Sequence, residues 1–171
     1  MATPPDAETQ AERIARFVKA EAGPLLDYFS RRTDNREDAA DLLGETLIVI
    51  WRKARVVPTD PIEARMWMFG VARRVLSQGR RSGTRRRALT EKLAQHLDAA
   101  PQADRDDREA DVRAAIAQLD HTDQEIIRLV YWDGFTLAEA AQLLTMNPAT
   151  VRSRHSRARA RLQNTLTSQR V

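Results

Sequence analysis

Apolar residues recur along this chain three or four positions apart, as on one face of an α-helix, and no stretch alternates apolar and polar residues over strand length. Two segments carry the pattern most clearly, and their apolar positions are Leu43, Leu47, Ile50 and Ala54, then Ile62, Met66, Phe69, Ala72 and Leu76. Glycine is scarce, with 6 among 171 residues. The sequence therefore predicts an all-α fold.

Helix boundaries in the first half follow from breakers and capping residues. Gly23-Pro24 predicts the end of a first helix carrying Ile14, Phe17 and Val18, and a second helix carrying Leu25, Leu26 and Phe29. Asn35, or Asp34 before it, can cap the next helix, which Pro58 and Pro61 bound at its exit.

The second half has the signals of a helix-turn-helix. Thr122–Glu125 and Thr136–Glu139 both have the pattern of a capping box. Gly134 ends the helix that begins at the first box. The apolar face of this helix is predicted as Ile126, Ile127, Val130 and Tyr131. Thr145-Met146-Asn147 is the predicted turn, after which Asn147 caps a last helix with Pro148 at its first position. The inward seam of that helix is predicted as Val151, His155, Ala158 and Leu162.

Charge is unevenly distributed along the chain. Residues 65–92 hold nine basic side chains and one acid, residues 98–111 hold six acids and two arginines, and residues 150–171 hold six arginines and no acid. With the breakers between them, these segments predict two small helical domains, at 10–82 and 109–168, joined by a flexible linker at 83–108. Two basic segments suit polyanion binding, although solvated helix faces and a charged tether explain the same charges.

The last helix is the candidate for reading duplex DNA. Helices fit the major groove, where N-terminal residues reach base edges and flanking arginines contact phosphates. The alternative is an ordinary solvated helix in a bundle. The candidate DNA-contacting residues of this helix are Ala149, Thr150, Arg152, Ser153, Arg154, Arg157 and Arg159.

Both halves resemble bacterial sigma factors of the extracytoplasmic-function (ECF) group of the sigma-70 family. Region 4 of that group is matched by Thr122–Leu129, Gly134–Ala141, Val151–Arg154 and Arg157–Arg159. Region 2 is matched by Arg36–Thr46, Trp51–Ala54 and Trp67–Arg74. The chain departs from the family pattern at Asp120, where proline is common, at Thr145, where glycine is usual, and at Arg74, where asparagine is common.

The resemblance implies a protein that binds core RNA polymerase, directs it to promoters and assists promoter opening. Its recognition helix would read the −35 element, and Asp38, Asp41 and Glu45 would dock on a coiled coil of the polymerase's largest subunit, unless they form only a solvated face. The loop from Arg55 to Ile62 would provide a pocket for the unpaired −10 strand. The side chains around that pocket would be Arg65, Trp67, Arg73, Arg74, Arg80 and Arg81, although Trp67, like Phe69, also fits a core position.

The resemblance also implies an anti-sigma factor as partner and a linker that threads polymerase channels. Two other classes remain open: a stand-alone helix-turn-helix regulator that binds duplex sites unaided, and an all-α interaction protein with no role at DNA. Cysteine is absent, the three histidines are scattered, and no phosphate loop or acid–base set is visible, so we expect no enzyme activity, metal or cofactor. With no signal peptide or membrane-spanning apolar run, we expect a cytoplasmic protein without membrane insertion.

Overall fold

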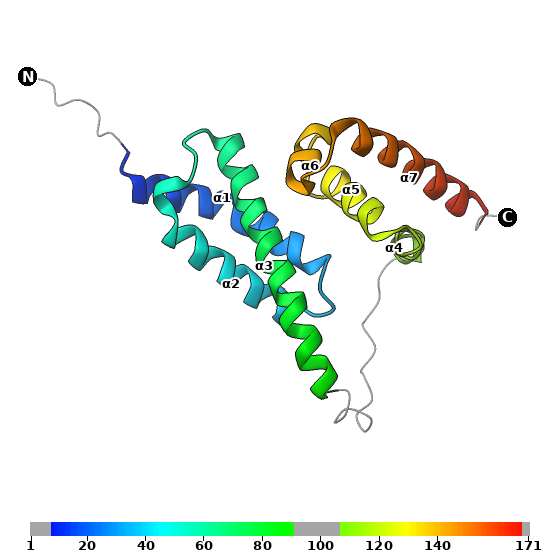
Figure 1. Ribbon diagram of the computed structural model, residues 1–171, viewed down its shortest axis with the longest axis horizontal. Coiled ribbons are helices and arrows are strands. Elements are labelled where there is room, and N and C mark those ends of the chain that lie inside the picture. The colour runs from blue at the N-terminus through cyan, green and yellow to red at the C-terminus, as the bar shows by residue number, and fades with distance from the viewer. Residues whose placement is uncertain (1–7, 91–106, 169–171) are drawn as a thin grey trace, which may run out of the picture. The chain divides into compact units, whose positions relative to one another are not determined.

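The computed structural model describes residues 8–90 and 107–168, with only the backbone of residues 81–90 and 107–109. Within these ranges every regular element is a helix, which confirms the predicted all-α fold (Figure 1). The chain divides into two compact units between Leu97 and Asp98.

The first unit packs three long helices against one another, with a short 3₁₀ turn between the second and third (Figure 1). Its elements are α1 (Gln10–Ser30), α2 (Arg36–Arg52), η1 (Ala54–Val56) and α3 (Pro61–Thr90). Because α3 continues to Thr90, the first residues of the predicted linker are helical.

The prediction that Gly23-Pro24 separates two helices is wrong, because α1 runs through Pro24 without ending. A proline inside a helix costs about 3 kcal/mol, since it removes one backbone hydrogen bond and crowds the preceding turn. Beyond it, Leu25, Tyr28 and Phe29 are buried on the side of α1 that also buries Ile14 and Phe17. Burying each such side chain stabilises the fold by about 1.5–3 kcal/mol, so together they outweigh the cost of the proline.

Polar side chains begin each helix of the first unit. Asn35 caps α2, as predicted, by accepting a hydrogen bond from the amide of Asp38 at 2.7 Å. Thr9 and Glu12 form a capping box at the start of α1, and Asp60 accepts from two amides in the first turn of α3. Ile62 in that turn was predicted to be apolar core but is 65% exposed, because the buried face of α3 begins at Ala64.

The core of this unit is built around edge-to-face aromatic contacts. The ring of Tyr28 lies 5.3 Å from Phe29 and 5.5 Å from Phe69, both nearly perpendicular to it. The guanidinium of Arg32 lies 3.8 Å from the centre of the Tyr28 ring and donates to the Tyr28 carbonyl. Phe69 is therefore a core residue.

The second unit contains four helices, shown from yellow-green to red in Figure 1. They are α4 (Asp107–Ala117), α5 (His121–Tyr131), α6 (Leu137–Leu144) and α7 (Pro148–Ser168). Ile116, Leu119, Ile127 and Ala158 form a buried cluster that joins α4, α5 and α7. The predicted seam of α7 is confirmed, since Val151, His155 and Ala158 are buried and Leu162 packs against this cluster.

Helix α5 begins earlier than predicted. Its cap is Asp120, which accepts from the amide of Asp123 at 3.0 Å, so the predicted capping box at Thr122 is wrong. With the helix starting two residues earlier, Asp120 accepts from the amide of Asp123, and the Glu125 amide that Thr122 was expected to bond lies inside the helix. Tyr131, predicted to face the core, is 54% exposed, whereas Ile126, Ile127 and Leu129 are buried.

Helices α6 and α7 and the turn between them have the predicted boundaries. Thr136 and Glu139 form the capping box of α6, and Asn147 accepts from the amide of Ala149 at 2.8 Å, next to Pro148 at the start of α7. Thr145 ends α6 in the left-handed region, with φ 55° and ψ 44°. A left-handed backbone costs an L-residue about 1–2 kcal/mol, more for a β-branched side chain, which explains why glycine suits this position.

We expect Thr145→Gly to raise the free energy of unfolding of the second unit by about 0.5–1 kcal/mol, because relief of strain exceeds the added entropy of the unfolded chain. Urea unfolding can be followed by the fluorescence of Trp132 with Trp51 and Trp67 replaced by Phe. Thr145→Ala is the control, since it keeps the Cβ and hence the strain. An equal increase in the free energy of unfolding in Thr145→Gly and Thr145→Ala would contradict strain at Thr145 as the cause.

Candidate nucleic-acid interface

The outward face of α7 combines small side chains with arginines. Ala149, Thr150, Arg152, Ser153, Arg157 and Arg159, all named from the sequence as DNA-contacting candidates, are exposed on this helix. The first turn of α7 contains no acid, so the positive end of the helix dipole adds to the charge of its arginines. This face can approach a polyanion closely.

Arg154, the remaining candidate of α7, is engaged within the unit. Its Nη2 lies 2.6 Å from both carboxylate oxygens of Asp120, and its Nε lies 2.8 Å from Oδ1 of Asp123. Only 25% of the Arg154 side chain is exposed. Arg154 therefore links α7 to the first turn of α5, and we leave it out of the exposed face.

A second polar contact to α7 is made by the seam residue His155. The Tyr131 hydroxyl of α5 lies 3.2 Å from Nε2 of His155, and the two rings stack with centres 5.8 Å apart. Burial, helped by the positive charge of Arg159, lowers the pKa of His155 below its ordinary value. A neutral imidazole at this position joins α7 to α5 without adding charge.

The residues predicted to surround the −10 strand lie along α3 in different environments. Arg65 donates to Glu21 at 3.1 Å and lies over the Phe69 ring, and Arg80 donates to the carbonyl of Arg32. Arg73 is half-buried and Arg74 is exposed. Trp67 is half-buried and packs against the core cluster of Ile14, Phe17 and Met68. The side chain of Arg81 lies outside the described residues.

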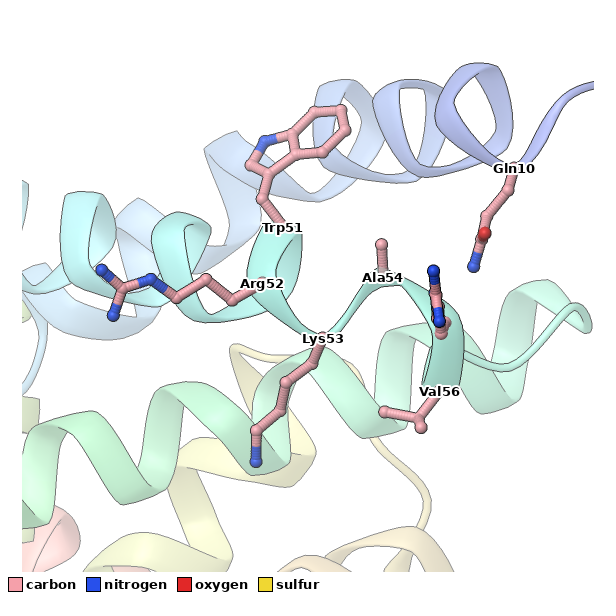
Figure 2. A pocket seen from close by; sticks show the side chains of 7 residues that line it. Gln10, Trp51, Arg52, Lys53, Ala54 and Val56 are labelled. Atoms are coloured by element: carbon pink, nitrogen blue, oxygen red, sulfur yellow. The ribbon is translucent and has the colours of Figure 1, made fainter.

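A shallow groove of about 510 Å³ lies where α2 and η1 meet the start of α1. It is lined by Gln10, Trp51, Arg52, Lys53, Ala54, Arg55 and Val56, with no acid among them. Figure 2 shows Gln10 facing η1 across the groove, while Arg52 and Lys53 extend outward from its rim. Trp51 is 46% exposed, so part of its ring is available to a ligand.

The sequence interpretation missed most of this groove. Its predicted pocket, from Arg55 to Ile62, contributes only Arg55 and Val56 to the lining. Trp51-Arg52-Lys53 was matched to a motif of region 2, but no function was assigned to these three residues. An aromatic residue followed by two cations, next to the predicted loop, is the signal that could have identified the groove.

The predicted docking residues Asp38, Asp41 and Glu45 form an exposed acidic stripe along α2. One carboxylate oxygen of Asp38 accepts from the side-chain amide of Asn35 at 2.9 Å, which ties this end of the stripe to the helix cap. At helical spacing, Ile48 continues the same face, and it is 51% exposed. The stripe is thus polar at its start and apolar further along.

Other kinds of site find little support in the described ranges 8–90 and 107–168. No three or more metal-binding side chains come together there. No helix in them is long and apolar enough to cross a membrane.

Comparison with known proteins places the two units among known folds and sequences. Residues 109–162, which span most of α4, all of α5 and α6, and most of α7, match the family described as sigma-70, region 4. Over 161 residues the chain is 28% identical to the ECF RNA polymerase sigma factor SigL of Mycobacterium tuberculosis, covering 86% of this chain and 85% of that protein. Over most of its length the chain is therefore similar to sigma factors of the ECF group, and residues 109–162 match the sigma-70 region 4 family.

Two solved structures share the fold. One contains the sigma factor RpoE with the anti-sigma factor NepR from Bartonella quintana, at 22% identity and a TM-score of 0.64, covering 90% of this chain and 96% of that one. The other contains CnrH with the cytosolic domain of CnrY, at 24% identity and a TM-score of 0.65, covering 94% and 90%.

These similarities support a function as a sigma factor, which acts with RNA polymerase in promoter-directed initiation of transcription. These matches favour that function over a stand-alone helix-turn-helix regulator.

Proposed function

We propose that three surfaces of this sigma factor divide the work of initiation. The exposed face of α7 reads the −35 element, the groove beside Trp51 and the exposed arginines of α3 hold the unpaired −10 strand, and the acidic stripe of α2 docks on core polymerase. The single observation that carries this proposal is the exposed face of α7, where arginines flank small side chains on the second helix of a helix-turn-helix. In domain terms, residues 10–82 and 109–168 act at the two promoter elements, with 83–108 as the linker.

The proposal extends to partners and compartment. RpoE was solved with an anti-sigma factor and CnrH with the cytosolic domain of CnrY, which supports an anti-sigma factor as partner of this chain also. Because core polymerase and promoter DNA are its targets, the protein acts in the cytoplasm. It supplies no catalysis of its own and needs no cofactor, since binding and orientation suffice for the task.

The groove suits a single strand for two physical reasons. A half-exposed indole offers a stacking surface to any base, and Arg52, Lys53 and Arg55 supply charge for the backbone. Arg65 is already paired with Glu21, so the more exposed Arg74 is better placed to meet phosphates. Trp67 supports the unit from its half-buried position.

Replacing Arg152 and Arg157 with Ala is expected to weaken the dependence of transcription on the −35 element. Each lost bidentate contact to a base costs about 1–3 kcal/mol, roughly 5- to 150-fold in affinity. Run-off transcription with core polymerase, on promoters with intact and scrambled −35 elements, measures the effect. Arg113→Ala on α4 is the matched control, and an unchanged −35 dependence in the Arg152 and Arg157 variants would argue against this surface.

We expect Trp51→Ala to weaken binding of a single-stranded −10 oligonucleotide by the holoenzyme. Loss of one base stack costs about 1–3 kcal/mol, whereas affinity for duplex −35 DNA should be unaffected. Fluorescence anisotropy with a labelled oligonucleotide measures both affinities. Trp132→Ala is the control, because Trp132 is 41% exposed but lies in the second unit. Equal oligonucleotide affinity in both variants would remove the groove from the proposal.

Docking through α2 can be tested by neutral isosteres. Asp41→Asn with Glu45→Gln removes two charges without changing shape, and hydrogen bonds to charged groups contribute about 1.5–3 kcal/mol each. We therefore expect affinity for core polymerase to fall by at least tenfold in competition with wild-type sigma factor. Glu63→Gln, an exposed acid on α3, is the control. If the Asp41→Asn, Glu45→Gln variant competes for core polymerase as well as the Glu63→Gln control does, the stripe is only a solvated face.

A further inference from the structure

Arg154 differs from the other arginines at the start of the recognition helix in being held by two acids of another helix. Asp120 binds it through both carboxylate oxygens at 2.6 Å, and Asp123 approaches its Nε at 2.8 Å. The Asp123 side chain is only 6% exposed, so this partner is shielded from water. The pair with Asp123 is therefore screened less by salt than a surface pair, whereas the Asp120 side chain is 54% exposed.

The buried seam of α7 consists of Val151, His155 and Ala158, and Leu162 packs against the same cluster. Apolar packing by itself is not directional, so polar contacts add to the definition of the helix's rotation. Tyr131 makes one such contact with His155, and Asp120 makes another with Arg154. A guanidinium bound to carboxylates has a fixed planar geometry, and it resists such rotation.

The anchor at the other end of this contact is itself fixed. Asp120 caps α5 by accepting from the amide of Asp123 at 3.0 Å. The pKa of Asp120 is lowered first by that amide, and also by Arg154, although burial opposes them, so the carboxylate is charged at neutral pH. One carboxylate therefore contacts both the start of α5 and Arg154 of α7.

We propose that Arg154 is a positioning residue for reading the −35 element: its bridge to Asp120 and Asp123 sets the rotation of α7 about its own axis. The rotation determines which exposed side chains of the first two turns, among them Arg152 and Ser153, meet base edges. A recognition site tolerates an angular error of only about 10–20°, so a modest rotation blurs base readout without abolishing binding to phosphates. This inference rests on the proposed −35 role of α7.

The test uses the full chain with core polymerase and a set of promoters carrying single-base changes in the −35 element. Arg154→Lys keeps the charge but loses the planar fork. Asp120→Asn keeps the helix cap, because asparagine caps as well as aspartate, but loses the charge that binds Arg154. Both should reduce discrimination among the promoters by about fivefold or more, with non-specific duplex affinity unchanged within about twofold. Arg161→Lys, an exposed arginine of the same helix, should discriminate as wild type does.

Each other outcome has a distinct meaning. Wild-type discrimination in both variants would overturn the inference, as would a uniform loss of affinity with a salt slope reduced by about 1, which would make Arg154 a phosphate contact. If Arg154→Lys unfolds at the assay temperature, Asp120→Asn decides the question, because its altered residue lies outside α7. If wild type itself shows no −35 dependence, or Arg152→Ala with Arg157→Ala has no effect, the proposed function fails before this inference is reached.

Discussion

The structure depends on side-chain oxygens that satisfy the first amides of its helices. Every helix start leaves donors without a backbone partner, and in units this small an unmet donor is a large fraction of the total stability. Thr9, Asn35, Asp60, Asp120, Thr136 and Asn147 each accept one or two of these amides. Three of them also lie next to a proposed functional surface, since Asn35 begins the helix with the acidic stripe, Asn147 begins α7 and Asp120 connects α7 to α5.

Capping residues were among the more predictable features of the sequence. Thr136 and Asn147 were predicted correctly, and at the start of α2 the structure selects Asn35 from the two predicted alternatives, Asp34 and Asn35. Thr122 was wrong because Asp120, two residues earlier, competes for the same role. Pro24 misled for a different reason: the apolar row beyond it continues the buried face of α1, and that long-range burial outweighs a local breaker.

The surfaces were less predictable than the helices, since a side chain's environment depends on segments far away in the chain. Arg154 and Arg157 are three residues apart and look alike in sequence, yet one is bound to acids 31 and 34 positions away and the other is exposed. Arg65 is similarly bound to Glu21. The groove beside Trp51 needed the start of α1, 41 residues earlier, to complete its lining.

Pro24 has a consequence for the motions of the first unit. Proline has no amide to bond the carbonyl of Ala20, an exposed residue, so α1 is continuous in shape but interrupted in its hydrogen bonds. Native proteins open locally where few bonds hold a segment, and this interruption separates the part of α1 before Pro24 from the part that carries Tyr28 and Phe29. Gln10, one wall of the groove, belongs to the earlier part. This wall of the groove is thus held in place by the burial of Ile14 and Phe17 more than by an unbroken ladder of backbone hydrogen bonds.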